Sequence, residues 1–111
     1  MKKKEIIKKS NDYTNIIIKN NKLKNKYYSI FYKKSSNTLF GISIPKKTGN
    51  AVIRNKIKRQ IKNIIDNNKI NIQKNYNYVI IIRRELLELS YIEKERELMT
   101  LFRRIGEKNE K

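Results

Sequence analysis

Hydrophobic residues recur most regularly between Ala51 and Ile65. Isoleucines stand three or four residues apart in this stretch, at Ile53, Ile57, Ile61 and Ile64. This spacing is the period of an α-helix that buries one face. Asn50 comes just before the stretch and is a residue type that caps the free backbone N–H groups of a helix start. The pattern therefore predicts a helix that packs its isoleucine stripe on the rest of the domain.

Three runs of aromatic, aliphatic and β-branched residues predict strands. The runs Tyr27–Tyr32 and Leu39–Ile44 are separated by the polar segment Ser35–Asn37, which predicts a hairpin turn between them. Pro45 ends the second strand, because it has no N–H to donate to a neighbour. The run Tyr78–Ile82 is apolar without alternation, which predicts a central strand that is covered on both faces.

The remaining pattern adds a short strand and two more helices. The polar stretch Lys19–Lys26 has room for an edge strand, and the apolar spacing within Asp12–Lys19 predicts a first helix. Ser90 and Glu93 form a capping box that begins a last helix, and Gly106 is expected to cap its end. The predicted fold class is α+β, with a single sheet of about four strands and with helices.

The charge of the chain indicates that this domain binds a partner. The chain has 28 Lys and Arg against 10 Asp and Glu, a formal net charge of +18. Such a density opposes compaction by self-repulsion unless a polyanion neutralises it, and nucleic acid offers closely spaced phosphates. A genome that enriches Lys, Asn and Ile would explain some of the lysines, but it would not explain the few acids. We therefore expect a nucleic-acid partner.

Composition also excludes several classes of site. The 111 residues suit one nucleic-acid-binding domain spanning 1–111, and we expect flexible ends at 1–8 and 107–111. Because the chain has no Cys and no His, disulfides, thiolate metal sites and the usual neutral-pH general base are excluded. No apolar run is long enough for a signal peptide or a membrane span, so we expect a cytoplasmic protein without a membrane partner.

The polar side of the predicted basic helix is cationic. Arg54, Lys58 and Lys62 fall in one row, and Asn55 and Arg59 fall in the next row, away from the isoleucines. Like charges at this spacing destabilise a helix by roughly 0.2–0.5 kcal/mol per pair. A charge run is often only a solvated face, but this helix contains no acid to offset the cost. The two arginines are the strongest candidates, since a guanidinium makes bidentate phosphate contacts.

The segment Gly41–Arg59 carries a family resemblance. Its sequence is Gly-Ile-Ser-Ile-Pro-Lys-Lys-Thr-Gly-Asn-Ala-Val-Ile-Arg-Asn-Lys-Ile-Lys-Arg. It resembles the motif of the bacterial ribonuclease P protein family, in which a basic strand end leads through Gly-Asn-Ala-Val into an Arg-Asn-Arg helix. The flanks agree, with Asp12-Tyr13 upstream and a strand at Tyr78–Arg83 downstream. The resemblance covers nearly the whole chain.

The resemblance implies the order α-β-β-β-α-β-α, with a left-handed crossover around the central basic helix, an exception to the usual right-handed rule. In the family, the basic helix and the loop before it dock on the RNA subunit. The residues that map to this role are Lys46, Lys47, Arg54, Asn55, Lys56, Lys58, Arg59 and Lys62. Lys56 stands where the family usually has a second Arg, so one bidentate contact is lost.

The resemblance also implies a cleft for the single-stranded 5′ leader of precursor tRNA, between the first helix and the sheet. By position it would be lined by Tyr13, Ile17, Phe31, Ser43, Arg54 and Asn55. Aromatic rings stack on unpaired bases with little sequence preference, as a variable leader requires. Ile17 replaces a frequent aromatic, which weakens stacking there, and Leu39 stands where a basic residue is common. From the pattern alone, Tyr13 and Phe31 would be core residues.

The implied function is that of a ribonuclease P subunit, which assists the hydrolysis of one phosphodiester to give the mature tRNA 5′ end. The implied partners are a catalytic RNA subunit, which would hold the Mg²⁺ ions, and precursor tRNA; no obligate protein partner is expected. No catalytic side chain is expected in this chain. Asp12 and Asp66 are far apart in sequence, and Glu85 and Glu88 are expected to be surface charges.

Three other interpretations stay open at this point. A ribosomal protein or RNA chaperone fits the charge equally well, but the Gly-Asn-Ala-Val-x-Arg-Asn arrangement does not follow from general RNA binding. A DNA-binding regulator would need a second helix in a helix-turn-helix arrangement, which the pattern does not show. A self-sufficient metal nuclease would need clustered carboxylates or histidines.

Overall fold

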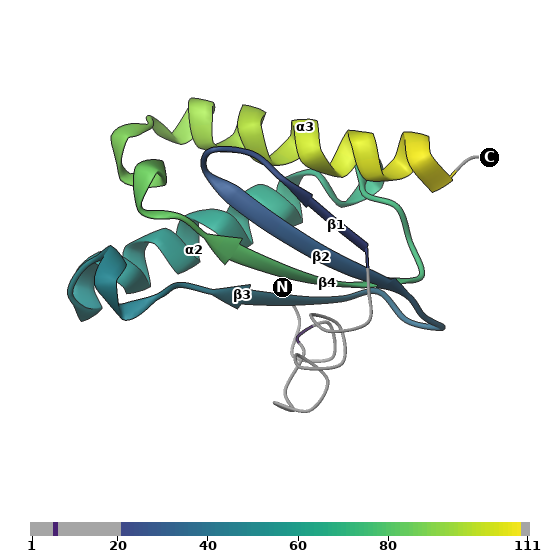
Figure 1. The fold of residues 1–111 in the computed structure, drawn as a ribbon, viewed down its shortest axis with the longest axis horizontal. Coiled ribbons are helices and arrows are strands. Elements are labelled where there is room, and N and C mark those ends of the chain that lie inside the picture. The colour runs from purple at the N-terminus through teal and green to yellow at the C-terminus, as the bar shows by residue number, and fades with distance from the viewer. Residues whose placement is uncertain (1–5, 7–20, 110–111) are drawn as a thin grey trace.

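A sheet and two long helices make up the described part of the chain, which in this computed structural model comprises Ile6 and residues 21–109 (Figure 1). The first helix predicted at Asp12–Lys19, with Tyr13 and Ile17, lies outside these residues. Ile6 forms an isolated parallel bridge with Phe40.

The four strands form one mixed sheet. They are β1 (Asn21–Lys24), β2 (Tyr28–Lys34), β3 (Leu39–Ser43) and β4 (Tyr76–Ile82). Their order across the sheet is β1-β2-β4-β3; β1 and β4 pair antiparallel with β2, and β3 pairs parallel with β4. The predicted α+β class with a four-stranded sheet is confirmed, as are the short edge strand and the central place of the last strand.

The predicted hairpin at Ser35–Asn37 is wrong. β2 and β3 do not pair, because β4 lies between them and bonds to both. The connection is tied instead to the start of β4: the Ser35 N–H donates to the Asn75 carbonyl at 2.8 Å, and the Asn75 N–H donates to the Thr38 hydroxyl at 2.8 Å. The largely apolar β4 takes an interior position, where both its edges are paired and where Tyr78, Val79 and Ile80 are fully buried.

Two capped helices cover one face of this sheet (Figure 1). Helix α2 (Ala51–Asn67) follows a 3₁₀ turn at Lys46–Thr48, and the Asn50 side chain accepts from the Ile53 N–H at 3.0 Å, as predicted. Helix α3 (Tyr91–Asn109) follows a 3₁₀ segment at Arg84–Glu88.

Ser90 and Glu93 form the predicted capping box at the start of α3. The Ser90 N–H donates to the Glu93 carboxylate at 2.9 Å, and the Glu93 N–H donates to the Ser90 hydroxyl at 3.2 Å. The prediction that Gly106 ends the helix is wrong, since α3 continues to Asn109. Gly106 does not adopt the positive φ that such a cap needs, so it extends the helix instead.

The core lies between this sheet face and the two helices. From α2 it takes Ile57, Ile61, Ile64 and Ile65, all at most 2% exposed. From the sheet it takes Phe40 and Tyr78, whose rings stack with centroids 5.5 Å apart. Ile53, predicted to join the stripe, is 37% exposed and packs over Gly49 instead, where an added Cβ would lie 3.0 Å from its Cγ2.

Candidate nucleic-acid interface

The solvent side of α2 is cationic along its length. Lys56, Lys58 and Arg59 are exposed, and Lys62 is half-buried. A shallow groove of about 450 Å³ runs along this side, lined by Val52, Asn55, Lys58, Arg59 and Lys62. We call the surface formed by Arg54, Asn55, Lys56, Lys58, Arg59 and Lys62 the basic face of α2. Its outward direction agrees with the helical pattern of the sequence.

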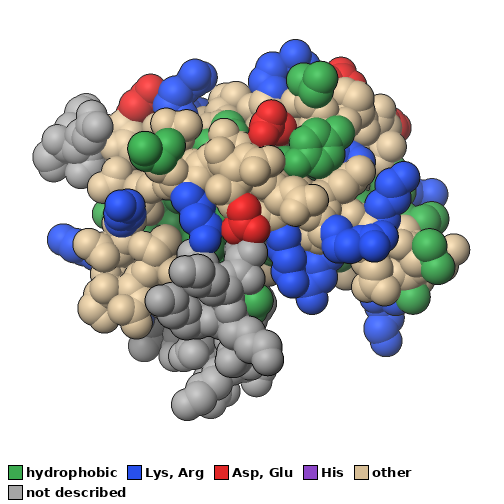
Figure 2. Space-filling view, turned by 180° about the vertical axis from the view of Figure 1, so that it is seen from behind, with side chains coloured by type: hydrophobic (Ala, Val, Ile, Leu, Met, Phe, Trp, Pro, Cys, Tyr) green, Lys and Arg blue, Asp and Glu red, His purple; other side chains and the backbone are tan. Residues whose placement is uncertain are grey.

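Acidic side chains do not neutralise the basic face within the described part of the chain. The ion pairs found there join Lys69 to Asp66 at 3.5 Å, Arg83 to Glu85 at 4.0 Å and Arg96 to Glu93 at 3.9 Å. None of these pairs involves a cation of the basic face. Figure 2 shows Lys and Arg side chains gathered toward the right of the rear view, the end of the molecule where α2 begins.

Arg54 has an unusual environment on this helix. The side chain is half-buried, and among the described residues its Nε is buried without a hydrogen-bond partner. A buried donor without a partner costs roughly 1–3 kcal/mol. Because this nitrogen has no open surface, a phosphate oxygen would reach it only after the side chain moved outward, and the hydrogen bond would then be charge-assisted. An anion that drew the guanidinium outward would relieve the cost of the buried donor.

Repulsion from the basic face reaches the neighbouring helix. Lys94 of α3 is buried, and its ammonium donates to the Gln60 amide oxygen at 2.8 Å. Burial lowers the pKa of Lys94, and the positive charge of Lys56 lowers it further. A polyanion bound to α2 would relieve this repulsion.

The loop before α2 extends the basic face. Lys46 and Lys47 are exposed on the 3₁₀ turn that follows β3, while Thr48 is buried beneath them. Lys47 also lines a cleft of about 420 Å³ together with Arg83 and Arg84, which follow β4. The predicted RNA-subunit residues of the loop and the helix thus belong to consecutive elements of the chain.

Phe31 and Ser43 lie on the sheet face that turns away from the helices, here called the second face. The register shows this, because Phe31 pairs with Val79 and Ser43 pairs with Ile81, out of phase with the core-facing Tyr78 and Ile80. Phe31 is half-buried and belongs to a small cluster around Val79 rather than to the main core. The predicted leader residues Tyr13 and Ile17 lie outside the described residues.

Two residues of these surfaces were not among the sequence predictions. Val52 is 76% exposed in the groove of α2, and its position off the isoleucine stripe could have revealed this. Lys22 of β1 places its Nζ 5.5 Å from the centroid of the Phe31 ring. No local pattern could have shown that contact, since it depends on the register of β1 against β2.

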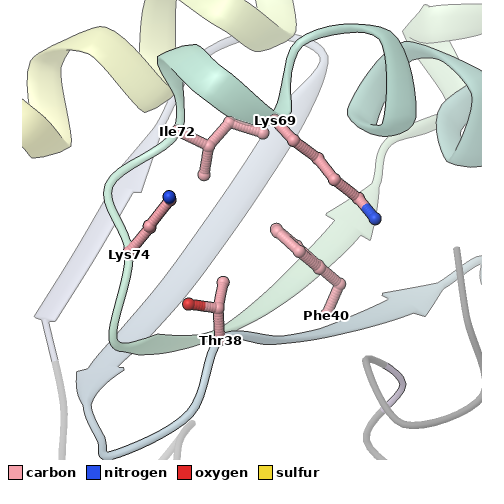
Figure 3. Close-up of a pocket in the computed structure, with 5 residues that line it drawn as sticks. All are labelled: Thr38, Phe40, Lys69, Ile72 and Lys74. Carbon is pink, nitrogen blue, oxygen red and sulfur yellow. The ribbon is translucent and has the colours of Figure 1, made fainter.

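A further pocket lies apart from these surfaces. It has a volume of about 120 Å³ and is lined by Thr38, Phe40, Lys69, Ile72 and Lys74 (Figure 3). None of the predicted site residues lines it.

The described residues hold neither a cluster of metal ligands nor a helix that could cross a membrane. Acidic side chains do not gather there in a group of three or more that would hold a metal ion. In the same part of the chain, neither α2 nor α3 has the length and apolar character to cross a membrane.

Sequence comparisons agree with the motif. A family model described as Ribonuclease P matches residues 1–106. The ribonuclease P protein component of Mesoplasma florum is 43% identical over 104 residues, covering 91% of this chain and 94% of that protein. The component of Bacillus cereus strain AH187 is 35% identical over 111 residues, covering 97% of this chain and 96% of that protein.

Solved structures show the same fold. The RNase P protein from Thermotoga maritima superposes with a TM-score of 0.84 at 28% identity, over 90% of this chain and 96% of that one. The Staphylococcus aureus RNase P protein gives a TM-score of 0.82 at 28% identity, over 92% of this chain and 94% of that one. The family match, the relatives and the shared fold together show that this chain belongs to the ribonuclease P protein family.

Proposed function

We propose that this chain binds the catalytic RNA subunit of ribonuclease P through the basic face of α2 and the Lys46–Lys47 turn, and that it grips the 5′ leader of precursor tRNA. Membership of the family already makes it a component of a ribonuclease P complex with a role in tRNA processing. The proposal assigns the basic face of α2 to the RNA subunit and the second face of the sheet to the leader. The observation that carries it is a helix whose cations face solvent, without acidic partners among the described residues.

The basic face is suited to a folded RNA. Its cations lie along one side of a 17-residue helix, so several phosphates could be contacted together and their counterions released. Arg54, whose Nε is buried without a partner among the described residues, and Arg59 in the groove favour direct guanidinium contacts over diffuse attraction. Asn55 adds a neutral donor and acceptor within the same groove.

The second face is suited to a single strand. Phe31 offers a half-buried ring, and Ser43 offers a hydroxyl two pairing rows away on β3. Stacking of a base on an aromatic ring contributes about 1–3 kcal/mol and tolerates any sequence. We propose that Tyr13 and Ile17 complete this site, and that Arg54 and Asn55 contact the leader near the junction of β3 and α2.

In this proposal the protein binds and positions substrate, and the RNA subunit carries out hydrolysis. Mg²⁺ held mainly by the RNA would supply the activation of water and the stabilisation of the leaving oxygen. The side chains of this chain would screen phosphate repulsion and hold the leader in place. Screening by the protein should lower the Mg²⁺ concentration at which the complex works.

The proposal is tested by adding the purified protein to its cognate RNA subunit at low Mg²⁺ and measuring cleavage of precursor tRNA. We expect cleavage that the RNA alone does not give, together with tighter binding of precursor than of mature tRNA. An unchanged Mg²⁺ requirement would contradict the screening role. Equal affinity for precursor and mature tRNA would instead favour a general RNA chaperone.

A further inference from the structure

Two lysines of β1 border the second face of the sheet. Lys22 pairs directly with Phe31, and Lys24 pairs with Ser29, so both lysines point to the same side as the Phe31 ring. Both are exposed, whereas Leu23 between them is buried in the core. We call Lys22 and Lys24 the β1 margin. The Lys22 Nζ lies 5.5 Å from the centroid of the Phe31 ring, within the range of a cation–π contact.

We propose that the β1 margin, chiefly Lys22, binds the phosphates of the single-stranded leader whose bases stack on Phe31. This inference rests on the proposed function, because it adds a phosphate contact to the leader site described there. In the free protein the Lys22 ammonium covers the ring. When a base stacks on the ring, the ammonium moves aside and pairs with the adjacent phosphate.

The energies favour this exchange. An exposed cation–π contact is worth roughly 0.5–1 kcal/mol. A base stacked on an aromatic ring contributes about 1–3 kcal/mol, and the displaced ammonium gains a phosphate partner. The lysine therefore protects the ring in the free protein without blocking the site. Its flexible four-carbon stem allows the movement, since Lys22 itself is exposed.

The strand register also places the proposed phosphate contact on the second face of the sheet. One pairing row runs from Lys22 through Phe31 and Val79 to Gly41, so the cation, the ring and a residue without a side chain follow one another across the sheet. Neighbouring strands lie about 4.8 Å apart, so the row spans roughly 14 Å. A strand of RNA stacked at Phe31 would have its backbone within reach of the β1 margin.

The test compares two single lysine substitutions in the complex assembled with the cognate RNA subunit. Lys22→Ala removes the proposed contact. Lys34→Ala removes the same charge from the exposed end of β2, at a position in phase with the core-facing Tyr32 and so on the other side of the sheet. Dissociation constants for precursor and mature tRNA are measured with each variant at several salt concentrations.

We expect Lys22→Ala to weaken binding of precursor tRNA about three- to tenfold and to leave binding of mature tRNA unchanged. The salt dependence of precursor binding should flatten by about 0.7 slope unit, the value for one single-strand phosphate contact. Lys22→Arg should restore both, because it keeps the charge. Lys34→Ala should behave as the unsubstituted protein does.

The outcomes separate the two proposals. If the unsubstituted complex does not prefer precursor tRNA, the leader site itself is absent, and the leader part of the proposed function falls together with this inference. If it does prefer precursor tRNA and Lys22→Ala matches Lys34→Ala, the leader site stands and the role of the β1 margin is overturned. Equal weakening of precursor and mature tRNA by Lys22→Ala would also overturn it.

Discussion

The buried side chain of Tyr28 links the sheet to helix α3. Tyr28 has no exposed surface, and its hydroxyl donates to the Lys94 carbonyl at 2.9 Å, joining β2 to α3. Burial raises the pKa of the Tyr28 hydroxyl above its ordinary value, and the negative charge of Glu97 raises it further. The pKa of Tyr78 is raised in the same way, chiefly by burial.

The raised pKa of Tyr28 predicts a loss of stability in alkali. Below about pH 10 the tyrosine is protonated in both states, and its contribution is complete. Above that pH the unfolded chain releases the proton while the folded protein keeps it, so the free energy of unfolding falls by up to about 1.4 kcal/mol per pH unit for each such group. Tyr28→Phe should cost roughly 1 kcal/mol at neutral pH and make the alkaline decline less steep.

Denaturant unfolding between pH 7 and 11 measures both effects for Tyr28→Phe. Some decline should remain in the variant because Tyr78 is unchanged. An equally steep decline in the variant and the unsubstituted protein would show that Tyr28 does not keep its proton in the folded state.

At the scale of elements, the position of the basic face depends on where α2 begins. The Asn50 side chain satisfies the Ile53 N–H, and Arg54 follows in the same first turns of the helix. Asn50→Ala should lower the free energy of unfolding by about 1 kcal/mol, within a range of roughly 0.5–2 kcal/mol for lost caps. The control is Asn63→Ala, an exposed position inside α2 that should be neutral or slightly stabilising.

Chemical denaturation measures the free energy of unfolding of both variants and so tests the role of the cap. If the two asparagine substitutions have equal effects, the cap is not what fixes the start of α2.

Most helices and strands were predictable from the sequence, because the signals for each one lie within its own segment. The isoleucine spacing gave α2, and the Ser90 and Glu93 capping box gave the start of α3. The hairpin failed because strand pairing is not local: the 35–37 turn is compatible with either arrangement, and only the competition for the central place decides between them. The cap expected at Gly106 also failed, since the backbone there does not adopt a positive φ and α3 continues to Asn109.

The same distinction between local and non-local signals applies to the candidate site. The basic face was predictable, because a helix places its residues by spacing alone. The position of Phe31 under Lys22 was not, because it depends on which residues face each other across two strands.

At the scale of the whole molecule, the net charge of +18 governs stability as well as binding. Self-repulsion should destabilise the free protein at low ionic strength, where the Debye length is about 30 Å. Raising the salt to roughly 0.15 M should raise the melting temperature by screening, and bound RNA should raise it further by mass action. Thermal unfolding across salt concentrations measures this, and a melting temperature independent of salt would contradict it.

The central claim is that the basic face of α2 meets the phosphates of the RNA subunit. The most direct measurement is the salt dependence of assembly for Arg54→Ala/Arg59→Ala, compared with Arg103→Ala/Arg104→Ala, which removes the same charge from exposed positions of α3. The α2 variant should bind the RNA subunit more weakly, with a slope flatter by up to about one unit for each arginine. Equal affinities and equal slopes for the two variants would contradict the claim.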